Sequence, residues 1–498
     1  MNMSNKGVLA TVDLGSNSFR LQICKVDGEQ IQVLDSLKEM VRLGAGLNEE
    51  KILSKSAQER AFVCLSKFSE RLRGFEPEQV RVVATNTFRV AKNAEEFTKK
   101  AQKALGFPIE IIAGREEARL IYLGVAHTLP KTGDRRLVVD IGGGSTEFIV
   151  GEDLNAMVTE SLPLGCVSYS MRYFPNGKIT HKGFQAAVLA ARNEIQRIAP
   201  LLKQYGWKLA VGSSGSARAL RDVVVATHTD STDISLPLLT EIAQKIIEAE
   251  SVKKARLAGM KSERMEVFAG GLAVMMAIFE ELDITQMSVV DVALREGVLY
   301  DLIGRKLSQD MRDVTVHHFE KQYSVDIEQA KRVLQVVQKL LAVLNIKESD
   351  FEEDDLKHIQ WAARLHEVGL TIAHTAYHKH SAYITANADM PGFSRQEQQW
   401  IALLILGHRG DLKKMGSQVK SRRMWMSVLI LRLAALFCRG RKEIRLPEHL
   451  QLVQTPKKTT LYVDESWLHQ NPLTASALAQ EQMQWRKLKK VFSVKGVH

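Results

Sequence analysis

Two short motifs of the same design constrain the fold more than any other feature of this sequence. Val8 to Val12 is an apolar, β-branched run that leads into Asp13 and a glycine turn, and Leu137 to Val139 leads in the same way into Asp140 and three glycines. A strand that ends in a carboxylate and a glycine loop is typical of the carboxyl edge of an α/β sheet, where such sheets bind ligands. The two copies are a whole subdomain apart rather than a short repeat apart. We therefore expect two related α/β halves that face a common cleft.

Strand and helix patterns divide the chain into an α/β part, a helical part and a small C-terminal unit. Strand-like runs alternate with helical periodicity up to about residue 306, and long helical patterns dominate after Asp310. Beyond the two motifs, strands are expected at 80–84, 109–112, 209–211, 450–453 and 459–463. Helices are expected at 57–72, 184–202, 327–344, 356–365 and 475–490. At 498 residues the chain is too long for one core, and we expect four domains, at residues 1–120, 121–306, 307–440 and 441–498.

Charge and hydropathy exclude several classes of protein. The net charge of +11 favours anionic partners, and no apolar run is long enough to cross a bilayer. The N-terminus lacks the basic and apolar pattern of a signal peptide, and the four scattered cysteines have no metal-ligand spacing. We expect a cytoplasmic protein with reduced thiols. Nucleic acid is not an expected partner, because no recognition motif accompanies the basic residues.

Glycine loops after the expected strands offer backbone N–H groups to phosphate oxygens. Gly15 allows a tight turn in the first copy, and the polar residues after it add side-chain donors. Three consecutive glycines in the second copy destabilise a fold unless another group must approach the backbone closely, which makes this copy more specific. A third loop of small residues follows the strand at 209–211 and suits a phosphate or nucleotide wall, although an ordinary turn explains it about equally well. The phosphate-binding residues expected from these loops are Ser16, Asn17, Gly142, Gly143, Gly144, Ser145, Thr146, Gly212, Ser213 and Gly215.

Charged side chains beside these loops supply candidates for a metal site and a general base. Asp140 can hold a hard cation such as Mg²⁺, directly or through water, and Glu147 can complete that site or orient a water. Glu116 and Glu117 begin an expected helix, where acidic residues usually only complement the helix dipole. Hydrolysis needs a base for water, so one of these two glutamates is the best candidate. Arg89 follows a strand and is either a clamp for phosphate oxygens or a surface arginine.

The helical part of the chain is rich in basic residues and histidines. Residues 411–445 hold ten Lys or Arg against two acids, which is typical of a solvated helix face or of a track for a polyanion. The candidates for such a track are Lys413, Lys414, Lys420, Arg422 and Arg423. His366 and Glu367 are similar to the His-Asp pair of helical metal-dependent phosphohydrolases. Because Glu replaces Asp and no second pair follows, we expect a scaffold or polyanion-binding bundle there rather than a metal site.

Taken together, six segments resemble the exopolyphosphatase and guanosine pentaphosphate phosphatase (Ppx/GppA) family in residue type and order. They are DLGSNSFR (13–20), GREEARLIY (114–122), DIGGGSTEF (140–148), the loop 212–215, ALREGVLYD (293–301) and LHEVGL (365–370). The resemblance runs from about residue 6 to the C-terminus. It implies duplicated actin-like (ribonuclease H-like) domains, then a helical domain related to the His-Asp fold and a small α+β C-terminal domain. It also implies a Mg²⁺-dependent phosphoanhydride hydrolase that is usually a homodimer.

The resemblance also implies roles for individual residues. Glu117 matches the family's general base, and Glu147 is counted as catalytic with it. Asp140, Glu147 and Asp13 match the metal and phosphate site, while Arg89 joins the loop residues in holding substrate phosphates. The expected reaction is in-line attack of a water activated by Glu117 on a terminal phosphorus.

Two substrates compete within the family, and both are anions that release orthophosphate. One is long inorganic polyphosphate, and the other is the stringent-response alarmone guanosine pentaphosphate (pppGpp), which loses its 5′ terminal phosphate. Segments 378–383, 390–393 and 408–409 are more similar to the polyphosphatase branch, so we expect a processive exopolyphosphatase, with pppGpp hydrolysis or both activities as the alternative. From another class, an actin-fold kinase or ATPase would use the paired loops for ATP and release no phosphate from polyphosphate. The basic segment is a candidate track for polyphosphate, with contact to the inner face of the cell membrane as an alternative role.

Overall fold

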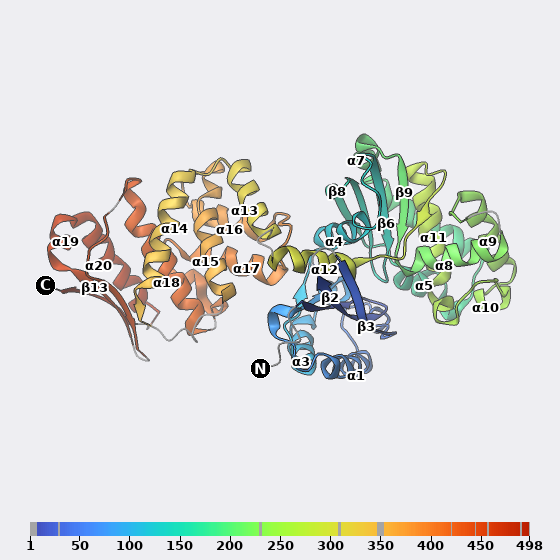
Figure 1. The fold of residues 1–498 in the computed structure, drawn as a ribbon, viewed down its shortest axis with the longest axis horizontal. Coiled ribbons are helices and arrows are strands. Elements are labelled where there is room, and N and C mark those ends of the chain that lie inside the picture. Colours follow the sequence, from blue (N-terminus) through green and yellow to red (C-terminus); the bar gives the residue numbers. More distant parts are fainter. Residues whose placement is uncertain are drawn as a thin grey trace. The chain divides into compact units, whose positions relative to one another are not determined.

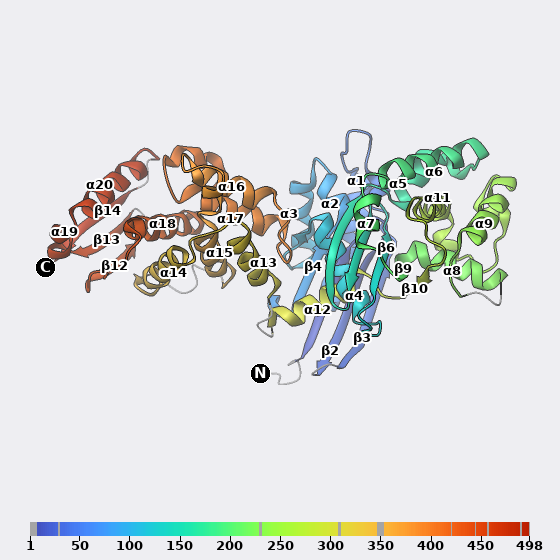
Figure 2. The same ribbon diagram turned by 90° about the horizontal axis from the view of Figure 1, so that it is seen from above.

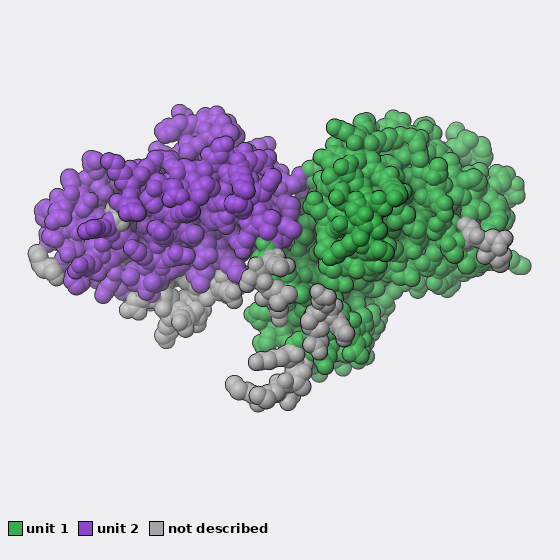
Figure 3. Space-filling view, turned by 45° about the horizontal axis from the view of Figure 1, so that its top comes forward, with its two compact units in different colours: residues 1–310 green, residues 311–498 purple. Residues whose placement is uncertain are grey.

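The computed structural model describes most of the chain, in two compact units. The described residues are 7–27, 30–228, 232–306, 310–345, 353–419, 421–443, 445–455, 458–488 and 491–497. The N-terminal unit comprises residues 1–310 and the C-terminal unit residues 311–498, as coloured in Figure 3. Figure 1 follows the chain through both units. None of the helices in the described ranges is long and apolar enough to cross a membrane.

The N-terminal unit contains two five-stranded sheets built to one plan. In each sheet a central strand pairs antiparallel with the next strand of the chain and parallel with a later one. The order β3-β2-β1-β4-β5 therefore corresponds to β8-β7-β6-β9-β10. The strands are β1 (Val8–Leu14), β2 (Phe19–Asp27), β3 (Gln30–Glu39), β4 (Val80–Ala84), β5 (Glu110–Ile111), β6 (Arg135–Ile141), β7 (Thr146–Glu152), β8 (Asn155–Leu162), β9 (Leu209–Ser213) and β10 (Ser288–Val289). This repetition confirms the duplicated α/β design that the paired motifs predict.

Helices cover these sheets and complete their cores. The apolar run at 268–279 forms the buried middle of α11, which contacts α5, α6 and α9 (Figure 2). The helices of this unit are α1 (Lys55–Arg71), α2 (Asn86–Val90), α3 (Ala94–Leu105), α4 (Gly114–Ala126), α5 (Cys166–Tyr173), α6 (His181–Ile195), α7 (Ala199–Tyr205), α8 (Ser214–Thr227), α9 (Leu236–Glu248), α10 (Val252–Ala255), α11 (Met265–Leu282) and α12 (Leu294–Lys306). The helix expected at 184–202 is thus two helices, α6 and α7. Pro200 explains the break, because it lacks a backbone N–H and lies in the first turn of α7.

The chain crosses between the two halves of the N-terminal unit twice. It passes from the first sheet to the second through α4, which packs on β7 and β8. It returns through α12, which packs on β1 and β4. A Cβ on Gly297 would lie 1.7 Å from the Leu120 carbonyl oxygen, so the two helices approach each other backbone to backbone. The expected boundary between residues 120 and 121 falls inside α4.

The C-terminal unit joins a helical bundle to a four-stranded sheet of order β11-β12-β13-β14 in one hydrophobic core. Its helices are α13 (Met311–Gln322), α14 (Ile327–Ala342), α15 (Glu353–Leu365), α16 (Tyr377–Asn387), α17 (Arg395–Gly407), α18 (Arg422–Phe437), α19 (Glu465–Gln470) and α20 (Pro472–Arg486). Its strands are β11 (Leu344–Asn345), β12 (Leu450–Gln454), β13 (Thr459–Asp464) and β14 (Phe492–Val497). The strand patterns predict β12 and β13 but miss β11 and β14. The helix expected at 475–490 begins earlier, at Pro472, and ends at Arg486, while residues 489–490 lie outside the described ranges.

Candidate functional site

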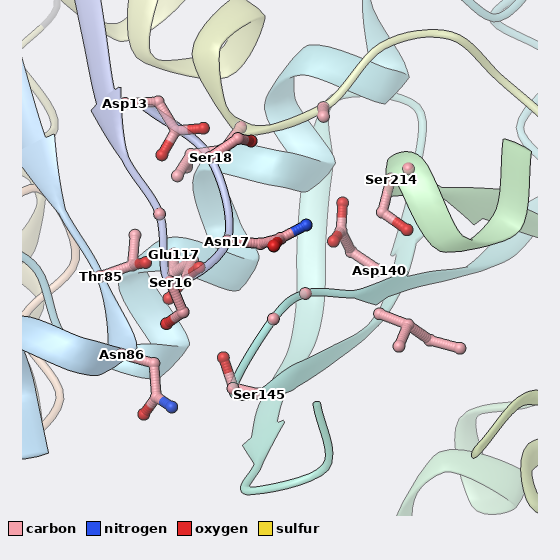
Figure 4. A pocket seen from close by; sticks show the side chains of 18 of the residues that line it. Asp13, Ser16, Asn17, Ser18, Thr85, Asn86, Glu117, Asp140, Ser145 and Ser214 are labelled. Carbon is pink, nitrogen blue, oxygen red and sulfur yellow. The ribbon is translucent and has the colours of Figure 1, made fainter. Parts of the chain in front are cut away.

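A pocket of about 110 Å³ lies where the glycine loops of the two sheets meet in the N-terminal unit. Figure 4 shows side chains from β1, α4, the loop after β6 and the start of α8 around this space. The expected site residues that line it are Asp13, Ser16, Asn17, Glu117, Asp140, Gly142, Gly143, Gly144, Ser145 and Gly215. The fold therefore brings together motifs that are far apart in the sequence.

The glycines of the second loop allow close contact with the first half of the unit. A Cβ on Gly144 would lie 2.1 Å from Nδ2 of Asn86, and a Cβ on Gly143 would lie 3.0 Å from Cβ of Ser16. On the other side, a Cβ on Gly165 would lie 2.2 Å from the Gly143 carbonyl oxygen. The sequence argument required something to approach this backbone closely. In the structure the neighbouring chain segments already do so, and a side chain at either loop position would have to displace Asn86 or Ser16 of the first half.

Glu117 enters the pocket from the first turn of α4 and is held by an arginine. Its Oε2 accepts a hydrogen bond of 2.7 Å from Nη1 of Arg89, and both side chains are almost completely buried. The same nitrogen of Arg89 also donates to the carbonyl of Ile112. Arg89 does not line the pocket, and its guanidinium orients Glu117 in this arrangement.

The other carboxylates of the site are close enough to disfavour one another's charge. Burial raises the pKa of Asp13 to about 7 and that of Asp140 to about 6, with the charge of Glu117 adding to both shifts. Glu147 faces Asp140 directly across the β6–β7 pair, and burial and the charges of Glu117 and Asp140 raise its pKa well above the ordinary value. Several acids therefore lie close together with little water around them. Binding of a cation, or of a proton to one of the acids, reduces the repulsion between their charges.

Removing the Asp13 carboxylate is expected to stabilise the metal-free protein at alkaline pH. The folded state keeps a proton on Asp13 up to a pKa of about 7, whereas the unfolded chain releases it near 3.8. Between these values the folded state binds more protons, so stability falls as the pH rises and stays low above about pH 7. Asp13→Asn should raise the free energy of unfolding by roughly 2 kcal/mol at pH 8 and by much less at pH 4. Thermal denaturation in EDTA at both pH values measures this, and an equal effect at both would contradict it.

Five expected site residues lie beside the pocket rather than on its wall, and one of them is Arg89. Glu147 accepts a hydrogen bond of 2.8 Å from the Ser161 hydroxyl. Thr146 donates to the carbonyl of Leu164, and Ser213 donates to the carbonyl of Val292 at 2.6 Å. Gly212 makes room for α8 and for the segment just before β10, because a Cβ there would lie 3.0 Å from both Ala217 and Met287. These contacts hold the loops that bear the lining residues.

Sequence reasoning missed four arginines that line the pocket. They are Arg20, Arg218, Arg264 and Arg295. Burial and the neighbouring cations lower the pKa values of Arg20 and Arg218 from their usual range. Such mutual repulsion is relieved by an anion. Arg20 and Arg295 lie inside the motif segments 13–20 and 293–301, and this position could have identified them as candidate site residues. No sequence pattern points to Arg264.

The pocket continues into a second cavity of about 250 Å³ with a basic wall. The two share Arg20, Gly215, Arg218 and Arg264. Further along, Lys38 pairs with Glu263 at 2.6 Å and Lys261 pairs with Asp222 at 2.7 Å. No carboxylate among the described residues lies within ion-pair distance of the Arg20 or Arg264 guanidinium. These two cations are therefore the ones best placed to receive an anionic ligand.

The basic residues of segment 411–445 largely have partners within the C-terminal unit. Lys414 is half-buried and donates to the carbonyl of Arg409, Arg422 donates to the carbonyl of Thr455, and Arg423 pairs with Asp355 at 3.1 Å. Lys413 is exposed, and Lys420 lies outside the described residues. The polyanion track stays a prediction.

Histidines and carboxylates do not assemble into a metal cage anywhere in the described ranges. His366 is buried, and its Nδ1 lies 2.7 Å from the carbonyl of Ala363. Glu367, its expected partner in a His-Asp-like pair, bonds to Arg441 at 2.6 Å. The surroundings of this pair are those of packed helices.

Comparisons with known proteins converge on one family. The family models described as "Ppx/GppA phosphatase family" and "Ppx/GppA phosphatase, domain III" match residues 22–306 and 311–482. A protein of Pseudoalteromonas translucida (strain TAC 125) named guanosine-5′-triphosphate,3′-diphosphate pyrophosphatase is 39% identical over 488 residues, which is 97% of each chain. An exopolyphosphatase from Cytophaga hutchinsonii is 23% identical with a TM-score of 0.55, over 60% of this chain and 98% of that one. A Ppx/GppA family member from Aquifex aeolicus is 25% identical with a TM-score of 0.51 over the same shares. These likenesses confirm the expected fold class.

Proposed function

Since the chain belongs to the Ppx/GppA phosphatase family, we propose that it hydrolyses pppGpp by removing the 5′ terminal phosphate. The observation that carries this proposal is the 39% identity over 97% of the chain with a relative named for a guanosine-5′-triphosphate,3′-diphosphate substrate. The comparison thus favours the substrate that the sequence analysis ranked second. Inorganic polyphosphate remains the competing substrate.

The basic second cavity supports a substrate that carries phosphates at two places. A terminal phosphate can occupy the pocket near Glu117, while a second phosphate group reaches Arg20 and Arg264, which line both cavities. Arginine binds phosphate oxygens through a planar fork of donors and suits this role. A linear polyphosphate would use the same cations without any requirement for a nucleoside.

The chemistry follows from the groups around the pocket. Glu117, oriented by Arg89, accepts a proton from a water that attacks the terminal phosphorus in line with the leaving oxygen. Backbone N–H groups of the two glycine loops, together with Asn17 and Ser145, stabilise the negative charge on the transferring phosphoryl oxygens. The shortened nucleotide leaves on the side of the arginines.

The carboxylates of the pocket fit a magnesium ion held jointly with substrate. Mg²⁺ is usually bound through one or two carboxylates, waters and substrate phosphates rather than by an all-protein cage. Asp13 and Asp140 line the pocket, and the raised pKa of each fits a site made for a cation. We propose that these two residues hold Mg²⁺, which would neutralise charge on the phosphates when bound.

The test is to compare orthophosphate release from pppGpp and from long-chain polyphosphate under equal conditions with Mg²⁺. We expect a kcat/KM for pppGpp at least about tenfold higher, with guanosine tetraphosphate as the nucleotide product identified by chromatography. Arg264→Gln should raise the KM for pppGpp about tenfold and leave kcat much less affected, because Arg264 is proposed to bind the substrate and not to take part in the chemical step. Arg221→Gln is the matched control, because Arg221 lines only the second cavity and already pairs with Asp222 and Asp291. Preference for polyphosphate would reverse the substrate assignment, and absence of release from either would overturn the proposed reaction.

A further inference from the structure

A buried cluster of charged side chains lies outside the pocket, between β4, α4 and α12. Its centre is Asp301 of α12. The Oδ2 atom of Asp301 accepts hydrogen bonds from Arg81 at 2.5 Å and from Arg305 at 3.2 Å, and the Oδ1 atom accepts one from Arg119 at 2.5 Å. Asp301 is 7% exposed, Arg81 2% and Arg119 8%. Burial alone would raise the pKa of Asp301, but the three guanidinium charges outweigh it and lower the pKa, so this carboxylate is ionised.

One of these arginines lies in the helix that carries the general base, and another lies in the strand that precedes the helix of its partner. Arg119 lies two residues after Glu117 in α4 and also bonds both carboxylate oxygens of Glu116 at 2.8 Å. Arg81 lies in β4, and the chain leads from this strand directly to Arg89, which binds Glu117 at 2.7 Å. Asp301 therefore bonds to α4, which carries Glu117, and to β4, the strand that leads into the short helix α2 of Arg89.

Packing between α4 and α12 brings the two helices together independently of charge. A Cβ on Gly124 would lie 2.8 Å from the backbone nitrogen of Gly297, and a Cβ on Gly297 would overlap the carbonyl of Leu120. The first residues of α12, Leu294 and Arg295, line the pocket, whereas Asp301 does not. One helix thus contributes to the pocket wall at its start and to the buried charge cluster two turns later.

We propose that Asp301 is a positioning residue that sets the place of the Glu117 carboxylate by joining α4 to β4. The inference rests on the proposed role of Glu117 as the base. A displacement of about 1 Å at a reacting group is enough to lower a rate by as much as 10²-fold, so a remote carboxylate can control kcat without touching substrate.

Asp301→Asn tests the proposal, because it keeps the shape of the side chain and removes its charge. We expect kcat to fall about 10- to 100-fold with KM changed less than about twofold. Asp301→Glu, which restores the carboxylate on a longer stem, should recover part of kcat. Arg305→Gln is the matched control, since it removes one arginine of the cluster but leaves the bonds of Asp301 to Arg81 and Arg119, and its kcat should stay within about threefold of the unchanged protein.

The double variant with Glu117→Gln separates positioning from a general loss of structure. If Asp301 acts through Glu117, Asp301→Asn should change the residual activity of Glu117→Gln less than about twofold, and the affinity of that variant for pppGpp should be the same with and without it. The inference would be overturned if the loss of kcat in the double variant equalled the product of the losses in the two single variants. An unchanged kcat in a folded Asp301→Asn protein would also overturn it. If Asp301→Asn does not fold, the kcat of Asp301→Glu relative to Arg305→Gln decides in the same way. Undiminished activity of Glu117→Gln would instead show that Glu117 is not the general base. This result differs from those that overturn the positioning role of Asp301.

Discussion

Glu117→Gln is expected to lower kcat for phosphate release by about 10²- to 10⁴-fold, the usual contribution of a positioned general base. Glutamine keeps the size of the side chain and can still accept a hydrogen bond from Arg89, so the fold and the KM should change little. The loss should therefore fall on the chemical step. Steady-state phosphate release, with thermal denaturation to check folding, measures both parts of the expectation.

Glu116→Gln is the matched comparison, because sequence alone leaves open which of the two glutamates is the base. Glu116 bonds Arg119 through both carboxylate oxygens and does not line the pocket. We expect this variant to be less stable, with a much smaller loss of kcat than Glu117→Gln. If the two variants exchange these effects, the base is Glu116, and if both keep full activity the base lies elsewhere.

Arg432→Met is expected to destabilise the C-terminal unit by about 3 to 5 kcal/mol, the usual effect of removing one partner of a buried ion pair. Nε and Nη2 of Arg432 bond the two carboxylate oxygens of Glu481 at 2.5 and 2.7 Å, and Nη1 donates to the Gly407 carbonyl at 2.6 Å. Both side chains are at most 8% exposed, so the variant leaves a buried carboxylate whose remaining donor among the described residues is Trp485. Denaturant unfolding followed by tryptophan fluorescence measures the change.

The double variant Arg432→Met with Glu481→Met is the control for this stability prediction. It removes both charges together, so most of the lost free energy of unfolding should return. A double variant as unstable as the single one would show that the hydrogen bonds of Arg432 to the α17 end, rather than the unpaired carboxylate, dominate.

Local chemistry in the sequence predicts much of the fold and part of the site. The strands expected before Asp13 and Asp140 are present as β1 and β6, each ending one residue after the aspartate, because a β-branched run followed by a glycine loop has few alternatives. The gathering of Glu117 with the loop after Asp13 follows from the carboxyl ends of strands meeting at one edge of the first sheet. Periodicity fails at 184–202, since apolar spacing does not reveal where Pro200 starts a new helix.

Contacts between residues far apart in the chain lie beyond such local reasoning. Arg432 counts as one more cation of a basic segment by sequence, yet its partner Glu481 neutralises it in the core. Arg264 joins the pocket from the position just before α11 without any motif, and the bond between Arg119 and Asp301 spans 182 positions. The sequence gives the number of charged residues, but the effect of each charge depends on which opposite charge the fold places beside it.

The double crossing of the chain between the two halves of the N-terminal unit limits how these halves can turn. A single linker permits rotation about many axes, but two separate connections permit easy turning only about the line that passes through both. Here that line runs through the packed pair α4 and α12, where the glycine backbones touch. Groups close to a hinge line travel least, so the Glu117 region is expected to act as the pivot. In any such turn we expect the glycine loops on the two sides of the pocket to move more than Glu117.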